Sequence, residues 1–97
     1  MKRDEALQIL SEHREDLKEF GVKRLAVFGS VARDEAGPES DVDVLVEFDD
    51  RPVGLFTFLR LKRYLEDILD HSVDLVTPDA LKRPLRDQIL KEAVRAA

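Results

Sequence analysis

Hydrophobic positions at helical spacing mark the first part of the chain. Residues 3–20 carry large apolar side chains three or seven positions apart, at Leu7, Leu10, Leu17 and Phe20. Acidic residues lie early in this segment and Lys18 lies late, which is the order of charge that the helix dipole favours. Gly21 then ends the pattern, as glycine often does after a helix. We therefore predict one helix over about residues 3–20.

Three short segments have the composition of strands. They are residues 23–29 (KRLAVFG), 41–48 (DVDVLVEF) and 72–77 (SVDLVT), which are rich in valine, leucine and phenylalanine. Residues 31–40 join the first two and contain a Gly-Pro pair, so we predict a short helical turn followed by a loop there.

Two further helices complete the predicted order. The pattern breaks after the second strand, at Asp49, Asp50, Arg51, Pro52 and Gly54. Residues 55–69 then return to helical spacing, with Tyr64 on the predicted solvent-facing side. Residues 84–96 form the last helix, with Pro84 at or near its first turn. The order predicts an α/β (α+β) fold, in which a small mixed β-sheet of three or more strands is flanked by helices in a single domain over residues 1–97.

This order of elements brings distant residues together. A helix joins the second and third strands, so these strands begin at the same edge if they run parallel in one sheet. Asp41, Asp43 and Asp74 lie at those strand starts. If the first strand runs antiparallel to the second, its end at Gly29 and Ser30 reaches that edge as well. We expect these residues to form one site.

The three aspartates have the chemistry of a metal site. Asp41 and Asp43 lie two positions apart on a strand, so their carboxylates face one side, about 6.5 to 7 Å apart at the backbone. Mg²⁺ typically takes one or two carboxylates together with phosphate oxygens and water. Asp74 adds a third carboxylate, whose structural alternative is a salt bridge to a buried arginine. We predict that all three are catalytic and bind metal, with Asp74 orienting or deprotonating an acceptor hydroxyl.

The Gly29-Ser30 pair supplies hydrogen-bond donors beside the negatively charged carboxylates. Glycine lets a phosphate approach the backbone closely, and free N–H groups with the Ser30 hydroxyl are suited to bind it. We predict that this pair holds the β- and γ-phosphates of a nucleoside triphosphate (NTP). Arg33 either contacts phosphate or pairs with Glu35 or Glu39. In phosphoryl and nucleotidyl transfer, metals align the reactants and neutralise developing charge, so such a set of residues indicates that chemistry.

Composition narrows the classes of partner. The formal net charge of −5 over 97 residues argues against broad capture of nucleic acid, which needs clustered Lys and Arg. A small triphosphate stays possible because a divalent cation can reverse the sign of an acidic pocket. The chain has no Cys, and no apolar run is long enough for a signal peptide or a membrane span. We expect a cytoplasmic protein without membrane contact.

The segment GSVARDEAGPESDVDVLVEF resembles the signature of the DNA polymerase β-type nucleotidyltransferase superfamily, a Gly-Ser pair followed after ten residues by Asp-x-Asp. It is most similar to the minimal nucleotidyltransferase (MntA-like) branch, and the resemblance extends over essentially the whole chain. It implies Gly29 and Ser30 as the nucleotide-binding pair, Asp41 and Asp43 as the metal pair, and Asp74 as the third carboxylate. ATP as substrate and two Mg²⁺ ions follow from the same resemblance.

The resemblance also implies a partner protein. Short transferases of this branch act as the antitoxin of a type VII toxin-antitoxin pair, by attaching AMP to a tyrosine of a HEPN-type toxin ribonuclease. Asp34 departs from the pattern, because similar sequences often have Gly at this position after Ala-Arg, and this leaves the conformation of the loop open.

Alternative functions stay open from sequence. Asp-x-Asp alone also occurs in glycosyltransferases and aspartyl phosphatases, and addition of nucleotides to RNA ends is disfavoured by the charge. A non-catalytic binding module that neutralises a partner by complex formation is the main alternative. The apolar face of the helix over residues 55–69, widened by Phe56, either closes the core or associates with the same or another chain.

Overall fold

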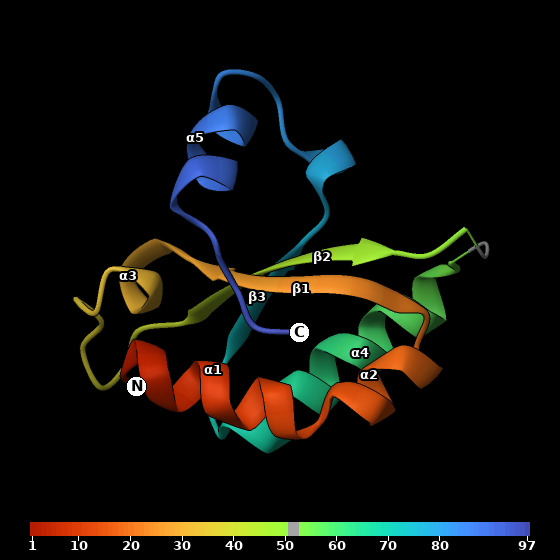
Figure 1. Cartoon of the computed structure of the whole chain (residues 1–97), viewed down its shortest axis with the longest axis horizontal. Helices are drawn as coiled ribbons and strands as arrows, with labels where there is room; N and C mark the ends of the chain where they lie inside the picture. The colour runs from red at the N-terminus through yellow and green to blue at the C-terminus, as the bar shows by residue number, and fades with distance from the viewer. Residues whose placement is uncertain (51–52) are drawn as a thin grey trace.

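A four-stranded mixed sheet forms the middle of the molecule (Figure 1). The computed structural model describes residues 1–50 and 53–97. Its strands are β1 (Val22–Phe28), β2 (Val42–Phe48), β3 (Val73–Val76) and β4 (Val94–Arg95). They lie in the order β3-β2-β1-β4; β1 is antiparallel to β2 and β4, and β2 is parallel to β3. The predicted fold class is confirmed, and the two strand directions that were conditions for one site are the ones observed.

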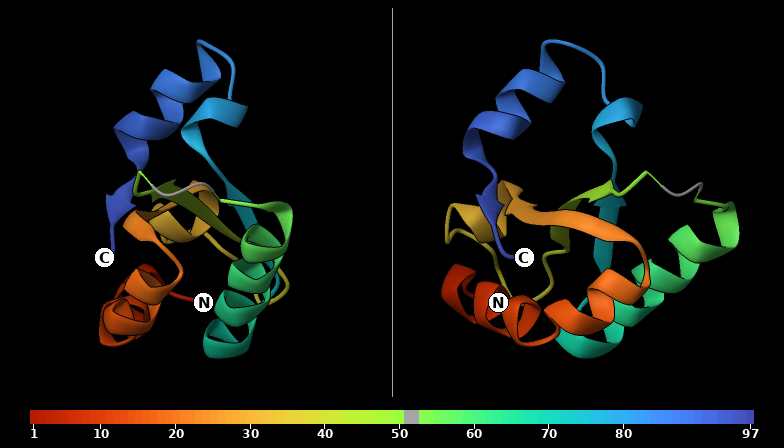
Figure 2. Two further views of the ribbon diagram at one scale, coloured as in Figure 1. Left: turned by 90° about the vertical axis from the view of Figure 1, so that its right-hand side faces the viewer. Right: turned by 45° about the vertical axis from the view of Figure 1, so that its right-hand side comes forward.

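Helices cover the two faces of the sheet unequally (Figures 1 and 2). One face carries α1 (Arg3–Glu12), α2 (Arg14–Glu19) and α4 (Leu55–Leu69), whereas α5 (Leu85–Glu92) and the 3-10 helix η1 (Pro78–Ala80) lie on the other. The short α3 (Gly29–Ala32) follows β1 directly. Within the described ranges, no helix combines the length and apolar composition that crossing a bilayer requires.

Alternation along β2 separates the two faces. Val42, Val44 and Val46 are fully buried in the main hydrophobic core, together with the inward side chains of α1, α2 and α4. Leu45 points to the other face, where it forms a second cluster with Phe28 and Ile89 of α5. Because successive strand residues face opposite sides, Asp43 shares the face of Leu45. The main core therefore occupies one face and leaves the other available for a site.

The first predicted helix is interrupted at His13, so the prediction of one continuous helix was wrong. His13 has φ −105° and ψ 16°, and its ring nitrogen Nδ1 lies 2.8 Å from the carbonyl oxygen of Ile9. The second segment contacts α4, since the Tyr64 hydroxyl donates to Asp16 at 2.8 Å and the Tyr64 ring packs on Phe20. Tyr64 is thus partly buried between helices rather than solvent-facing, which corrects its predicted placement.

The end of the chain also differs from the prediction. The last helix ends at Glu92 instead of continuing to Ala96, and β4 pairs with the outer edge of β1. The backbone N–H of Ala96 donates to the carbonyl oxygen of Leu25 at 2.8 Å, and Leu25 N–H donates back to Ala97 at 3.0 Å. Pairing satisfies backbone groups of β1 that helix formation at residues 93–96 would leave open.

Two predictions concern the region around the start of α4. Of the residues that break the pattern before this helix, Arg51 and Pro52 lie outside the described residues. Leu61, Leu65 and Leu69 of α4 are buried, but Phe56 is 82% exposed and Leu55 is 69% exposed. Phe56 therefore does not close the core. Association through this face stays a prediction.

Candidate active site

Two of the predicted aspartates are direct neighbours across the parallel strands. Asp43 of β2 pairs in register with Asp74 of β3. The flanking residues Val42 and Val73 are buried in the main core, so both carboxylates face the opposite side, which α5 partly covers. Asp41 immediately precedes β2 and lies two positions before Asp43. The three acidic residues therefore lie beside one another, as the order of elements predicts.

Electrostatic repulsion links these carboxylates. Burial raises the pKa of Asp43 above its ordinary value, and the charges of Asp74 and Asp41 raise the pKa further. The charge of Arg33 lowers the pKa of Asp43, and the charge of Glu92 raises it by a smaller amount. Asp41 and Asp74 are exposed, so the cluster opens to solvent on this face of the sheet. The site holds an excess of negative charge that a bound cation would relieve.

Gly29 brings the end of β1 against the carboxylates. Phe28 pairs with Asp43 in the antiparallel ladder, so the next residue turns immediately beside that side chain. Gly29 adopts φ +71°, and a Cβ at this position would overlap Oδ2 of Asp43. Only glycine meets both conditions without strain. Ser30 follows it at the start of α3 and is partly exposed.

Arg33 pairs with two acidic side chains. Its Nε lies 3.1 Å from Oε2 of Glu35, and its Nη1 lies 3.3 Å from Oε1 of Glu92. The hydrogen bond to Glu35 is the main cause of a raised pKa for Arg33. Of the predicted partners, Glu35 is therefore the one the structure shows, and contact with phosphate stays a prediction. Asp74 has an exposed side chain and needs no buried arginine.

Glu92 is the member of this site that the sequence did not indicate. Its Oε1 accepts a hydrogen bond from the backbone N–H of Gly29 at 3.3 Å, in addition to the contact with Arg33. The two residues are 63 positions apart. Ile89 of the same helix packs on Phe28 and Leu45, which brings the end of α5 over the turn. No local pattern around Glu92 signals this contact.

The carboxylates fit a metal ion that is bound together with phosphate. Among the residues that the structure describes, no group of three or more His, Cys, Asp or Glu side chains could by itself hold an ion. The three aspartates therefore do not form a complete cage. They can each supply an oxygen on one face, and Mg²⁺ readily takes its remaining ligands from phosphate and water. The donor set suits a metal-triphosphate complex better than an isolated ion.

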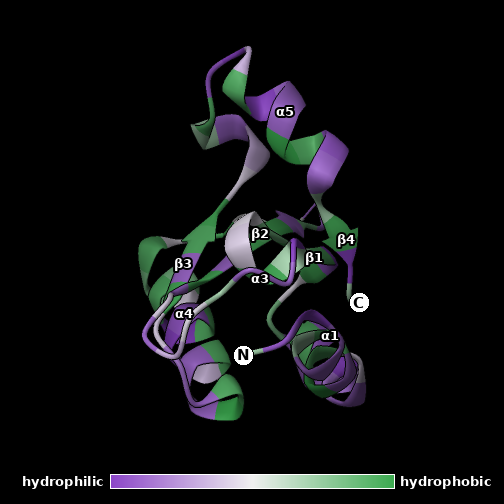
Figure 3. Cartoon of the chain, turned by 90° about the vertical axis from the view of Figure 1, so that its left-hand side faces the viewer, coloured by the Kyte–Doolittle hydropathy of each residue, from purple (hydrophilic) through white to green (hydrophobic). Residues whose placement is uncertain are grey.

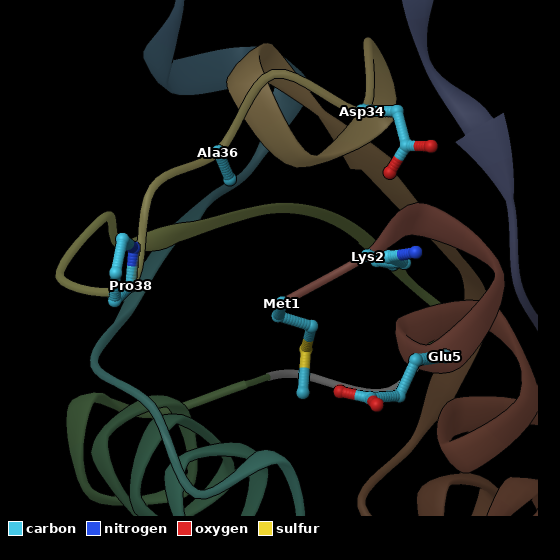
Figure 4. A pocket seen from close by; sticks show the side chains of 6 residues that line it. All are labelled: Met1, Lys2, Glu5, Asp34, Ala36 and Pro38. Atoms are coloured by element: carbon cyan, nitrogen blue, oxygen red, sulfur yellow. The ribbon is translucent and has the colours of Figure 1, made fainter.

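Asp34 keeps the loop conformation that a glycine would favour. It has φ +59°, a left-handed conformation that Asp tolerates better than most residues. Its Oδ1 accepts a hydrogen bond from the backbone N–H of Arg3 at 3.2 Å, which ties the loop to the start of α1. The adjoining hollow has a volume of about 630 Å³, and Figure 4 shows the side chains that line it. This hollow is lined by Met1, Lys2, Glu5, Asp34, Ala36 and Pro38, and not by the aspartates of the candidate site.

Comparison with known proteins identifies the family of this chain. Residues 10–96 match the family described as Nucleotidyltransferase domain. The chain is 44% identical over 92 residues to the protein adenylyltransferase MntA of Thermococcus cleftensis, covering 94% of this chain and 92% of that protein.

Solved structures show the same fold. A proposed minimal nucleotidyltransferase matches with a TM-score of 0.83 at 37% identity, over 97% of this chain and 95% of that one. A second match comes from the tri-AMPylated HEPN toxin of Shewanella oneidensis in complex with MNT antitoxin. It has a TM-score of 0.65 at 19% identity and covers 94% of this chain and 71% of the other. At that identity the second match supports the fold alone.

Proposed function

Because this chain belongs to the nucleotidyltransferase domain family and is an enzyme, we propose that it transfers AMP from ATP to a hydroxyl group of a partner protein. One observation carries the proposal. Asp43 and Asp74 are register neighbours on one face of the sheet, and the Gly29 turn lies directly against the Asp43 carboxylate. A triphosphate at this turn would have its phosphates next to both carboxylates.

Each residue has a distinct part in the proposed reaction. Asp41 and Asp43 hold the metal-bound triphosphate, while the Gly29 N–H and the Ser30 hydroxyl bind its β- and γ-phosphates. Asp41, Asp43 and Asp74 would hold Mg²⁺, for which we propose two ions, and the bound metal would neutralise charge on the phosphate oxygens. The acceptor hydroxyl attacks the α-phosphorus, its proton passes to Asp74 or to water beside it, and pyrophosphate leaves. Arg33 contributes positive charge beside the phosphates.

We propose a HEPN-type toxin as the partner and one of its tyrosines as the acceptor. Support comes from the relative named protein adenylyltransferase MntA and from the fold match to an MNT antitoxin in complex with an AMPylated HEPN toxin. Modification would neutralise the toxin, so the chain would act as the antitoxin of a type VII pair. The acidic surface charge fits a protein acceptor better than a polynucleotide.

A second candidate function is neutralisation by complex formation without chemistry. The observation in its favour is the exposed apolar start of α4, where Leu55, Phe56 and Leu59 are all at least 49% exposed. Exposed apolar groups of this kind are typical of interaction surfaces. Both functions would use complex formation, and only the first needs the aspartates.

Labelled-AMP transfer separates the two candidates. Purified chain, a HEPN-type toxin and α-labelled ATP are combined, and Asp41→Asn and Asp43→Asn are compared with Asp67→Asn. Asp67 is an exposed aspartate of α4, and this helix covers the sheet face opposite the site (Figure 2), so the substitution controls for the loss of one charge. We expect transfer to fall by at least about 100-fold in the first two variants, the scale of losing one electrostatic contact to a transition state. The control should keep full transfer.

Growth rescue completes the test. Cells expressing the toxin receive the wild-type chain or the variant with both Asp41→Asn and Asp43→Asn, and binding to the toxin is measured in parallel. Lost rescue with preserved binding supports the transferase. Full rescue by the double variant would instead establish neutralisation by complex formation.

A further inference from the structure

Glu92 occupies hydrogen-bond donors that belong to the candidate nucleotide site. One of its oxygens, Oε1, accepts from both the backbone N–H of Gly29 and Nη1 of Arg33, each at 3.3 Å. No local sequence feature requires this contact, because α5 reaches the turn from the far end of the chain. A carboxylate oxygen has the same charge and acceptor character as a phosphate oxygen.

The bonds to Glu92 are suited to exchange. Both distances lie beyond the usual range of about 2.7–3.2 Å for N–H···O bonds, so each bond is weak. The Glu92 side chain is 29% exposed, and water can replace its contacts. Glu92 also lies outside the main core, on a helix held by the small cluster of Phe28, Leu45 and Ile89. Figure 3 shows this helix as mainly hydrophilic, with hydrophobic segments between the hydrophilic ones. The side chain can therefore turn away at little cost to the main core.

Two anions cannot use the same N–H in the same way. If the Gly29 N–H binds a phosphate of ATP, as the proposed function requires, Glu92 must first leave it. Its negative charge would also repel an approaching triphosphate. Once Glu92 leaves, Nη1 of Arg33 becomes available, while Nε keeps its bond to Glu35. Every one of these effects opposes nucleotide binding as long as Glu92 is in place.

We propose that Glu92 sets the affinity of the site for triphosphates by occupying the phosphate-binding donors Gly29 N–H and Arg33 in the nucleotide-free chain. This inference rests on the proposed function for the identity of those donors. Nucleotide binding is then an exchange, in which a phosphate displaces the Glu92 carboxylate. The alternative is that Glu92 permanently supports the turn, so that its removal would weaken binding.

Binding of tripolyphosphate in the presence of Mg²⁺ tests the exchange without any transfer reaction. The amide resonance of Gly29 is followed by NMR in the ¹⁵N-labelled full chain while tripolyphosphate is added. The variants are Glu92→Ala and Glu92→Gln, and the matched control is Asp87→Asn, an exposed residue of the same helix. We expect roughly three- to tenfold tighter binding in both Glu92 variants, as fits loss of one partly exposed, charge-assisted contact. Asp87→Asn should bind like the wild type.

A measurement without ligand verifies the contact itself. Hydrogen exchange of the Gly29 amide should be faster in Glu92→Ala than in the wild type, because its acceptor is gone. Unchanged exchange would overturn the inference. Unchanged or weaker tripolyphosphate binding in Glu92→Ala would overturn it as well, and so would the absence of binding by every form of the chain.

The outcome is separable from the fate of the proposed function. Tighter tripolyphosphate binding with no AMP transfer by any form would leave this inference standing and reject the transferase. AMP transfer by the wild type with no gain of affinity in Glu92→Ala would reject this inference and leave the transferase standing. In an active enzyme, Glu92→Gln should lower KM for ATP more than it changes kcat, because it alters binding before the chemical step.

Discussion

Replacing Gly29 by alanine tests the tightest contact of the candidate site. Alanine at φ +71° costs about 1–2 kcal/mol, because its Cβ approaches the following carbonyl. The same Cβ would overlap Oδ2 of Asp43, so the carboxylate has to move. Asp43 is only partly buried and can swing toward solvent, which limits the loss of stability but misplaces the metal ligand. We expect Gly29→Ala to lower the free energy of unfolding by about 1–3 kcal/mol and to reduce AMP transfer by about 100-fold or more.

Urea unfolding and labelled-AMP transfer measure the two effects. Gly37→Ala is the matched control, since among the described residues a Cβ there has only Oγ of Ser40 nearby, at 3.8 Å, and the change should be neutral or slightly stabilising. In the Asp43→Ala background the overlap with the carboxylate is absent and only the Cβ at position 43 remains close, at 3.3 Å, so the cost of Gly29→Ala should fall toward that of the backbone alone. A Gly29→Ala variant as stable and as active as Gly37→Ala would refute the reasoning, and an equal cost in both backgrounds would exclude Asp43 as the clashing group.

Three further predictions follow from single contacts. In the metal-free chain, Asp43→Asn should be more stable than the wild type at pH 7. Burial raises the folded-state pKa of Asp43, so the stability of the wild type falls as pH rises above the ordinary value of 3.8. Urea unfolding should show that the difference in stability vanishes below that pH. Tyr64→Phe should cost about 0.5–1 kcal/mol in urea unfolding without loss of transfer. Tyr64 is the one tyrosine of the sequence, so absorbance titration reports on it alone. Burial and the bond to Asp16 should give it a pKa of about 12, and Asp16→Asn should lower that pKa. Asp34→Ala should be about 1 kcal/mol less stable than Asp34→Gly, since both lose the same acceptor but only alanine is strained at φ +59°; equal stabilities would contradict this.

The central strands and their aspartates could be predicted because their signal is local. Residues 42, 44 and 46 are all valine, so the buried face of β2 leaves a single orientation for Asp43. The helix between β2 and β3 is compatible with a parallel pair, and that pairing, which the structure shows, places Asp74 beside Asp43. The position of Gly29 follows from the antiparallel pairing of β1.

Other features depend on contacts that no local pattern encodes. The break at His13 contains neither Gly nor Pro, and the only local hint is that Glu15 and Asp16 could open a new helix. The two-residue strand β4 exists through its pairing with β1 and is too short to show periodicity. Glu92 reaches Gly29 only because Ile89 packs on the far face of the sheet. Such features are decided by tertiary packing.

The strict alternation along β2 has a consequence for how this chain can change over time. Individual valines on the buried side can be exchanged for other apolar residues, since the carboxylates on the opposite side do not depend on them directly. Loss or gain of one residue between positions 42 and 46 has a different effect, because it would turn the acidic groups into the interior and the apolar groups into water together. We therefore expect descendants of this sequence to tolerate apolar substitutions on the buried side of β2, but not insertions or deletions within this strand.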